Sequence, residues 1–225
     1  MTLQLGCLRQ NTLPANDPFW LTKTCHSERG NLAIRGKIHQ DHTALLDLIK
    51  SCGKRKDLQK GIRIHGDLLK GGLFRHDIYV NTALICMYSK CGDLLKAREV
   101  FDGLVERNVV SYNVLIAGYV QHGFDEEALQ CFERMQDEMV LPNSGTLSCL
   151  LKACGNLRSI HKGEQVHSEV HKQHLSLRNQ MLLKTALVDM YVKFGSMANA
   201  RKVFDSLPVR DIVSWTALIA GYVEY

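Results

Sequence analysis

Residues 82–92 read TALICMYSKCG, and residues 185–195 read TALVDMYVKFG. The same spacing of 103 positions relates AREVFDGL to ARKVFDSL further along each copy, and VVSYNVLIAGY at 109–119 to IVSWTALIAGY. Over the first 23 positions of the two copies, 13 residues are identical. A fixed spacing over so many positions indicates an internal repeat, which must be recognised before any single element is assigned.

The stretch 109–143, VVSYNVLIAGYVQHGFDEEALQCFERMQDEMVLPN, shows how one unit is organised. Two apolar stripes with helical spacing occupy its two halves. Their members are Leu115, Ile116 and Tyr119 in the first half, and Ala128, Cys131, Phe132 and Met135 in the second. The dipeptide His122-Gly123 separates the stripes, and Pro142 follows the second one. The unit is therefore predicted to be a helix, a short turn and a second helix.

The same division applies along most of the chain. We expect units at about 42–77, 78–108, 109–143, 144–180 and 181–211, and a partial unit at 212–225. Their turns are expected near Gly53, Gly92, Gly155 and Gly195. Successive units of 31, 35 and 37 residues account for the spacing of 103. Because one hairpin cannot bury its apolar face alone, the hairpins are predicted to stack into an all-α solenoid with a groove lined by the first helices.

The composition is that of an ordinary globular protein, with 45% hydrophobic and 23% charged residues. No run of 18 apolar residues occurs, so no membrane span is expected. The net charge of +5 permits a polyanionic partner without requiring one.

The eight cysteines include no C-x-x-C pair, which argues against a zinc site. Five of them fall within apolar helical patterns, namely Cys52, Cys86, Cys131, Cys149 and Cys154. Buried, reduced thiols in a reducing compartment are therefore favoured over disulfides.

Residues 1–41 lack the repeats and are expected to form an irregular leader. No continuous apolar segment indicates a secretory signal. The basic bias fits an organellar targeting segment, but the single serine, Ser27, is fewer than such segments usually carry. Both interpretations, a targeting segment and an ordinary leader, stay open.

The units at 78–108, 109–143 and 181–211 carry the pattern [TN]-x-L-I-x-x-Y with small variations, then a glycine turn, then A-[RL]-x-x-F, and the partial unit at 212–225 carries the first pattern. No unit shows the W-x₂-L-G-x₂-Y pattern of tetratricopeptide repeats. With the rotation of unit lengths, the sequence from 42 to 225 resembles the pentatricopeptide repeat (PPR) family, in its plant PLS subclass of short, standard and long repeats. The resemblance implies a right-handed superhelical α-solenoid of PPR/TPR-like repeats.

Repeats of this family read single-stranded RNA, one base per repeat. The resemblance implies that the fifth residue of the first helix and the last residue of the repeat read the base, while the second residue stacks on it. The implied base-reading residues are Thr82, Asn108, Asn113, Asn143, Thr185, Asp211 and Thr216. The implied stacking residues are Tyr79, Val110, Leu182 and Val213, and the implied phosphate contacts are Lys90 and Lys193.

The family's code implies adenine for Thr82 with Asn108, a pyrimidine for Asn113 with Asn143, and guanine for Thr185 with Asp211. The long units depart from the pattern, because Leu46 and Ser148 stand at their fifth positions. We do not expect them to follow the same code.

A structural role is the alternative for each of these residues. Threonine and asparagine near a helix start often cap the helix. Lysines near a helix end complement the helix dipole without any RNA.

No enzyme, cofactor or metal site is expected. The H-x-E triplets of a zinc deaminase occur at 26–28 and 167–169, but neither has a P-C-x-x-C partner. No P-loop, nucleophile elbow or dinucleotide fingerprint is present. Relatives of the resembled subclass often end in a deaminase-like extension, and Tyr225 stands halfway through a hairpin, so we expect a partial chain.

The sequence therefore predicts an RNA-binding protein of the mitochondrion or chloroplast that recognises sites of C-to-U editing. Its expected partners are single-stranded RNA and proteins of an editing complex, with no membrane and no small-molecule substrate. RNA stabilisation or splicing is the alternative within the same class. A helical scaffold that binds other proteins is the alternative from another class.

Overall fold

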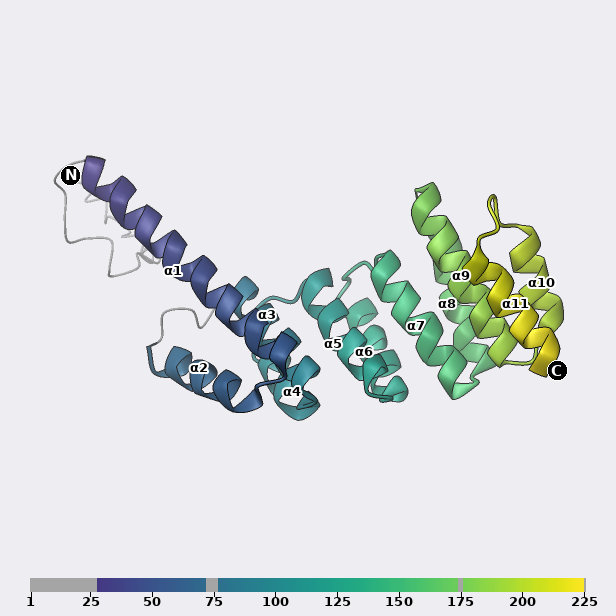
Figure 1. The fold of residues 1–225 in the computed structure, drawn as a ribbon, viewed down its shortest axis with the longest axis horizontal. Helices are drawn as coiled ribbons and strands as arrows, with labels where there is room; N and C mark the ends of the chain where they lie inside the picture. The colour runs from purple at the N-terminus through teal and green to yellow at the C-terminus, as the bar shows by residue number, and fades with distance from the viewer. Residues whose placement is uncertain (1–27, 72–76, 174–175, 225) are drawn as a thin grey trace, which may run out of the picture. The chain divides into compact units, whose positions relative to one another are not determined.

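The computed structural model describes residues 28–71, 77–173 and 176–224, with side chains from residue 42 onward. Every regular element of these segments is an α-helix (Figure 1). The eleven helices of this part of the chain are α1 (Glu28–Arg55), α2 (Leu58–Gly71), α3 (Ile78–Cys91), α4 (Leu94–Asp102), α5 (Val109–Gln121), α6 (Asp125–Asp137), α7 (Ser144–Leu157), α8 (Ile160–Lys172), α9 (Leu177–Lys193), α10 (Met197–Asp205) and α11 (Ile212–Glu224). None of them is both long and apolar enough to cross a bilayer.

The chain divides into two compact units, Met1–Thr43 and Ala44–Tyr225. Residues 1–27 of the expected leader lie outside the described residues. Residues 28–41, which were expected to be irregular, form the beginning of α1. The second unit holds the rest of α1 and all the other helices.

The second unit consists of helical hairpins stacked side by side (Figure 1). Helix α3 packs on α4, α5 on α6, α7 on α8 and α9 on α10. Each first helix also packs on the next first helix, in the order α3, α5, α7, α9 and α11. The predicted all-α solenoid is therefore confirmed, with the first helices in one layer and the second helices in another.

A repeated aromatic contact joins two of the hairpins to the first helix that follows them. The Phe101 ring of α4 meets the Tyr112 ring of α5 edge to face, with 4.9 Å between centroids. The same contact joins Phe204 of α10 to Trp215 of α11 at 4.7 Å. Phe101 and Tyr112 are fully buried, and burial of such a side chain contributes about 1.5–3 kcal/mol. The 103-residue spacing in the sequence thus reflects one packing contact formed twice.

The predicted turns at Gly92, Gly123 and Gly195 are confirmed. These glycines have φ angles of 86°, 79° and 72°, in the left-handed region that glycine adopts without strain.

The turns expected near Gly53 and Gly155 are wrong by a few residues. Helices α1 and α7 continue past these glycines, and the left-handed residues Lys56 and Arg158 follow the helix ends instead. The glycines serve helix packing: a Cβ on Gly53 would lie 3.2 Å from the Met87 Cα of α3. Gly155 faces α9 in the same way.

The last residue of most predicted units caps the first helix of the next unit. Asp77 accepts hydrogen bonds from amides of α3, Asn108 from amides of α5, and Asn143 from amides of α7. Asp211 accepts a 2.8 Å bond from the Ser214 amide of α11. Each such side chain satisfies helix-start amides that would otherwise lack a partner.

The predicted border at 180–181 is the exception. Helix α9 begins at Leu177, after Ser176, and so starts four residues before the expected position. Residues 177–180, LRNQ, contain no proline or glycine, and they extend the helix.

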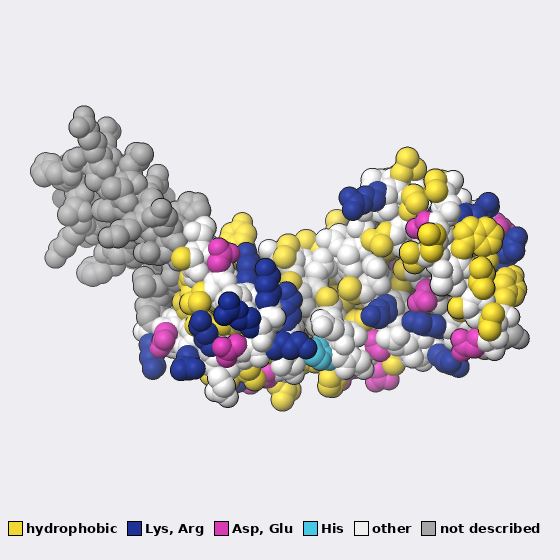
Figure 2. All heavy atoms as spheres, viewed as in Figure 1, with side chains coloured by type: hydrophobic (Ala, Val, Ile, Leu, Met, Phe, Trp, Pro, Cys, Tyr) yellow, Lys and Arg dark blue, Asp and Glu magenta, His cyan; other side chains and the backbone are white. Residues whose placement is uncertain are grey.

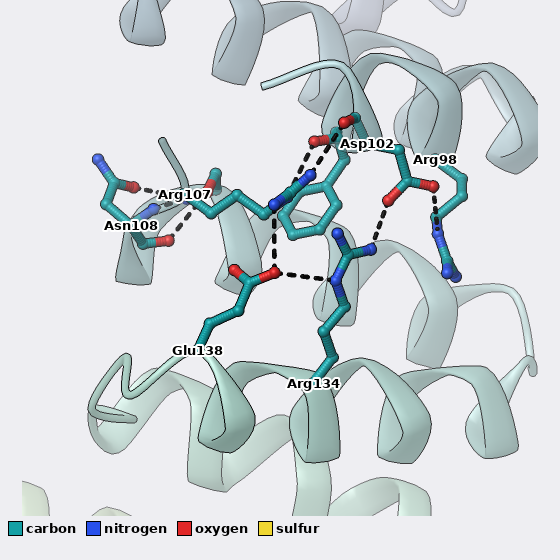
Figure 3. A network of polar contacts seen from close by, with 8 residues as sticks. Arg98, Asp102, Arg107, Asn108, Arg134 and Glu138 are labelled. Carbon is teal, nitrogen blue, oxygen red and sulfur yellow. Dashed lines mark hydrogen bonds and ion pairs between the residues drawn. The ribbon is translucent and has the colours of Figure 1, made fainter. Parts of the chain in front are cut away.

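A network of charged side chains joins the hairpin α3–α4 to the hairpin α5–α6 (Figure 3). Asp102 of α4 accepts from Arg98 at 2.9 Å and from Arg134 of α6. Glu138 accepts from Arg134 at 3.0 Å and from Arg107 at 3.1 Å. The charges alternate along this chain of contacts, so Asp102, Arg134 and Glu138 each pair with two groups of opposite charge.

The network also covers the aromatic core. The guanidinium groups of Arg107 and Arg134 lie 5.3 Å and 5.6 Å from the Phe101 ring centroid. Burial by itself raises the pKa of the Asp102 carboxyl, but hydrogen bonds from Arg134 and Arg98 outweigh it and hold the pKa below its ordinary value.

Replacing Asp102 by asparagine is expected to lower the free energy of unfolding at neutral pH by about 0.5–1 kcal/mol, because the pairs are partly exposed. Since folding depresses the Asp102 pKa, the contribution is present above the ordinary carboxyl pKa of about 4 and is lost as pH falls through the lower folded value. Urea unfolding of the wild type and Asp102→Asn at about pH 7 and about pH 3 measures both effects.

The matched control is Asp205→Asn, which lies 103 positions later. Asp205 pairs with Arg201 and Arg210, both of its own repeat. It should therefore cost less than Asp102→Asn. Equal losses would mean that the pairing of Asp102 with Arg134 does not help to join the two hairpins.

Candidate nucleic-acid interface

The first helices present equivalent side chains on one face. Residues three and four positions apart lie on the same side of a helix. We define the reading face by the second, fifth, ninth and thirteenth residues of each unit. On α3 these residues are Tyr79, Thr82, Cys86 and Lys90, and on α5 they are Val110, Asn113, Ala117 and Gln121. Because successive first helices pack side by side, their reading faces adjoin.

A shallow groove of about 220 Å³ lies between α3 and α5 on this face. Lys90, Val110 and Asn113 are among its lining residues. Three predicted site residues, taken from two neighbouring repeats and assigned three different roles, therefore line one groove.

The predicted stacking residues form an exposed apolar row. Tyr79, Val110, Leu182 and Val213 are exposed to 70%, 53%, 50% and 63%, respectively. Single exposed apolar residues are ordinary on a protein surface, but these four recur at the same position of four helices. The row offers exposed apolar contacts at repeated intervals.

The fifth residue of one repeat and its last residue meet directly at Asn113 and Asn143. The Asn113 Nδ2 donates to the Asn143 Oδ1 at 3.0 Å. The same Oδ1 accepts from the backbone amides of Gly145 and Thr146 at 2.9 Å and 3.1 Å. Among the described residues, the Nδ2 group of Asn143 has no hydrogen-bond partner. One oxygen thus caps α7 and orients Asn113, while an amide donor remains for a ligand.

The other two predicted pairs are arranged differently. Within the described segments, no hydrogen bond joins Thr82 to Asn108 or Thr185 to Asp211. Asn108 caps α5, and Asp211 caps α11. Hydrogen bonds from the amide and the hydroxyl of Ser214 lower the Asp211 pKa. Asn108 and Asp211 therefore act as helix caps, which is the structural role that was the alternative to base reading.

Thr82 and Thr185 are half-buried on the reading face, and Thr216 is exposed. The Thr216 hydroxyl donates to the backbone carbonyl of Ile212 at 2.7 Å.

Sequence reasoning missed three buried hydroxyls at the third position of the first helices. Ser111, Thr146 and Ser214 are fully buried. Ser111 and Thr146 each accept a bond from the N-cap backbone amide, at 3.1 Å in both cases, and so complete a capping box. The Thr146 hydroxyl also donates to the Asn113 Oδ1. The signal was present as Asn or Asp followed three residues later by Ser or Thr.

The two predicted phosphate contacts lie in the last turns of α3 and α9. Lys90 is exposed. Lys193 forms an ion pair with Asp189 at 3.1 Å and donates to Asn156 at 3.4 Å. Its charge is therefore partly compensated.

Three more lysines occupy the reading face and were not predicted. Lys50 and Lys54 stand at the ninth and thirteenth positions of the unit 42–77, and Lys152 at the ninth position of the unit 144–180. All three are exposed. Figure 2 shows Lys and Arg side chains gathered over the part of the surface where α1 and α3 lie. Positive charge therefore accompanies the apolar row.

Comparison with known proteins identifies the repeats. The profile described as "PPR repeat family" matches residues 107–156, and that described as "PPR repeat" matches residues 82–109 and 185–212. The chain belongs to the pentatricopeptide repeat family. The division of its repeats into short, standard and long types stays a prediction.

The relatives of these pentatricopeptide repeats include proteins of Arabidopsis thaliana. "Pentatricopeptide repeat-containing protein At3g53360, mitochondrial" is 36% identical over 179 residues, which are 80% of this chain and 23% of the relative. "Pentatricopeptide repeat-containing protein At1g11290, chloroplastic" is 40% identical over 178 residues, which are 79% of this chain and 22% of the relative. The chain thus spans about a quarter of the length of these relatives.

Solved pentatricopeptide repeat structures share the fold. The pentatricopeptide repeat protein PPR10 from maize matches 85% of this chain and 29% of its own, with a TM-score of 0.58 and 18% identity. The PPR domain of Arabidopsis thaliana protein-only RNase P 1 matches 80% of this chain and 98% of its own, with a TM-score of 0.62 and 13% identity.

Capping and ligand contact can be separated at Asn143. Asn143→Ala is expected to lower the free energy of unfolding by about 1 kcal/mol, because the α7 amides lose their acceptor. Asn143→Asp keeps the capping oxygens and should leave stability close to the wild type. Thermal and urea unfolding of both variants measure the difference.

If Asn143→Asp lost as much stability as Asn143→Ala, the stabilisation by Asn143 would not come from its capping oxygen. The matched control is Asn108→Ala, which removes the equivalent cap of α5 and should cost about the same.

Proposed function

We propose that this chain binds single-stranded RNA along the reading face, with one base placed at each repeat. The observation that carries the proposal is the recurrence of an exposed apolar residue followed three positions later by a polar one, on α3, α5, α9 and α11. An apolar side chain can cover the face of a base, and a polar side chain can bond to its edge. Family membership and the adjoining lysines support the same proposal.

A related fold gives further support. The PPR domain of Arabidopsis thaliana protein-only RNase P 1 was solved in complex with tRNA. That protein is too distant for its contacts to be transferred to this chain, but it shows that repeats of this fold can engage RNA.

The bases proposed for three repeats follow the family's code. Asn113 with Asn143 takes a pyrimidine, Thr82 with Asn108 takes adenine, and Thr185 with Asp211 takes guanine. The hydrogen-bonded Asn113–Asn143 pair supports the first of these, since both amides are oriented before the base arrives.

We further propose that the protein acts in the mitochondrion or chloroplast and marks sites of C-to-U editing, without catalysing the reaction itself. The mitochondrial and chloroplastic names of the relatives support the compartment. The rotation of unit lengths 31, 35 and 37 supports the editing role through the PLS subclass. Proteins of an editing complex would then supply the catalytic zinc chemistry.

RNA affinity is expected to fall steeply as salt rises, because each lysine–phosphate contact releases a counterion. Lys90→Gln should make the slope of log affinity against log salt shallower by about 0.7. Fluorescence anisotropy with a labelled RNA over a salt series measures this slope. The matched control is Lys96→Gln on α4, where the lysine already pairs with Glu99 and lies away from the reading face.

No measurable RNA affinity at low salt would contradict RNA binding and favour a scaffold that binds proteins. An equal change of slope for Lys90→Gln and Lys96→Gln would show that the RNA does not follow the reading face.

Asn113→Thr creates the Thr–Asn combination already present at Thr82 and Asn108. It is expected to shift the preference at one base from pyrimidine to adenine, by roughly 1–3 kcal/mol between matched and mismatched RNAs. The overall stability should change little, because Asn143 still caps α7. Competition binding with RNAs that differ at each position in turn measures the preference.

Ala117→Ser serves as the control, because it adds a hydroxyl one turn further along the same face. A preference that shifts equally in both variants, or at several bases at once, would contradict the assignment of one base to Asn113.

A further inference from the structure

Two equivalent pockets each lie beside a histidine that is hydrogen-bonded to a tyrosine of the following unit. His65 Nδ1 lies 2.9 Å from the Tyr88 hydroxyl, and His167 Nδ1 lies 2.8 Å from the Tyr191 hydroxyl. The first pair borders a pocket of about 480 Å³ formed by α2, α3 and α4. The second borders a pocket of about 550 Å³ formed by α8, α9 and α10. The α2–α4 pocket can therefore be compared, position by position, with the α8–α10 pocket.

The α8–α10 pocket lies on the side of α9 away from the reading face. Its α9 residues include Lys184, Leu187 and Tyr191. At 3.6 residues per turn, these point roughly opposite to Leu182 and Thr185. A ligand in this pocket would not compete with RNA for the same surface.

The two pockets differ in charge. In the first, Lys96 forms an ion pair with Glu99, and Asn81 lines the wall, so the two formal charges cancel. The residues that occupy the equivalent positions of the second pocket are Asn199, Lys202 and Lys184. The second pocket thus replaces a neutral set with two lysines.

A second histidine adds to this difference. His171 stands where the first pocket has Leu69, and its Nε2 lies 3.1 Å from the Nε2 of His167. One of the two nitrogens must donate to the other. Among the described residues, no aspartate or glutamate lines the pocket. Cationic and neutral donors therefore converge there without a carboxylate to neutralise them.

The rest of the lining suits an organic ligand. Val170, Leu187 and Val203 supply apolar surface, and Asn199 supplies a side-chain amide. The volume of about 550 Å³ is in the range of small-molecule sites.

We propose that the α8–α10 pocket binds a phosphate group carried by a small molecule, held by Lys184, Lys202 and the paired imidazoles. A lysine ammonium is a common phosphate ligand, and it acts as a point charge. The Lys184 amine already donates to the Ser206 carbonyl at 2.7 Å, which holds its side chain against the C-terminal end of α10. Ser206 is itself part of the lining.

The site should bind more tightly as pH falls from about 8 to about 6, since a bound anion favours imidazolium. Burial and then the neighbouring His171 lower the His167 pKa, whereas Glu164 of the same helix acts in the opposite direction. Across the pocket the charged groups are Lys184 on α9 and Lys202 on α10, and Tyr191 stays neutral because burial raises its pKa.

Isothermal titration of the whole chain with AMP, adenosine and inorganic phosphate tests the proposal. AMP is expected to bind and adenosine to fail. Tighter binding of AMP than of inorganic phosphate assigns a nucleotide-like source, and equal binding assigns free phosphate. Binding of adenosine as tight as that of AMP, or no binding of either phosphate compound, overturns the proposal.

The first pocket provides the matched variants. The exchange Lys184→Asn, Asn199→Lys and Lys202→Glu gives the second pocket the polar residues of the first and should weaken AMP binding by roughly tenfold or more. The reverse exchange, Leu69→His, Asn81→Lys, Lys96→Asn and Glu99→Lys, should create a second binding site. Because this reverse variant leaves the α8–α10 pocket unchanged, it still tests the proposal if the first variant folds poorly. Unchanged AMP binding in the folded first variant contradicts the assignment, as does a reverse variant that gains no site.

RNA binding is measured on the same samples. It should be the same with and without saturating AMP, so loss of RNA binding alone would leave the phosphate site intact. Full displacement of AMP by RNA would overturn the separate pocket.

Discussion

The structure depends on the burial of one face of each first helix by the first helix that follows. A single hairpin leaves this face open to water, so its stability comes from its neighbours. At one border the ring of Phe101, on the second helix α4, packs against Tyr112 of the next first helix, and Phe204 and Trp215 form the same contact 103 residues later. Because each first helix from α3 to α9 packs on the next one, the residues on the opposite face of these helices are brought into register without any requirement of their own.

Charge and capping add to that packing at the borders. The network of Arg98, Asp102, Arg134, Glu138 and Arg107 joins two hairpins beside the Phe101 ring. The capping side chains at 77, 108, 143 and 211 satisfy amides at the start of the next helix. Apolar burial fixes the spacing of the hairpins, and these polar contacts fix how each chain segment enters the next helix. The positions proposed to meet RNA are therefore set by contacts that need no RNA.

Periodicity and repetition were enough to predict the helices, most turns and the solenoid, because these follow from apolar spacing and from glycine. The turns at 53 and 155 were misplaced because a glycine can serve close helix packing as well as a turn, and only the neighbouring Met87 or α9 decides between them. The start of α9 was missed because no residue in 177–180 interrupts a helix. At the candidate site, equivalent positions could be assigned from the sequence, whereas the Asn113–Asn143 bond and the Lys193–Asn156 bond depend on contacts between helices.

The double duty of the border residue has a consequence for how such arrays can diversify. A side chain such as Asn143 must be able to cap a helix. Substitutions there are therefore limited by the stability of the fold, whatever their effect on ligand binding. Exchange between asparagine and aspartate keeps the cap, whereas a bulky apolar residue would not. Few residue types are therefore acceptable at each border. New base preferences are more easily acquired at the fifth position, because Thr82, Asn113 and Thr185 do not cap a helix.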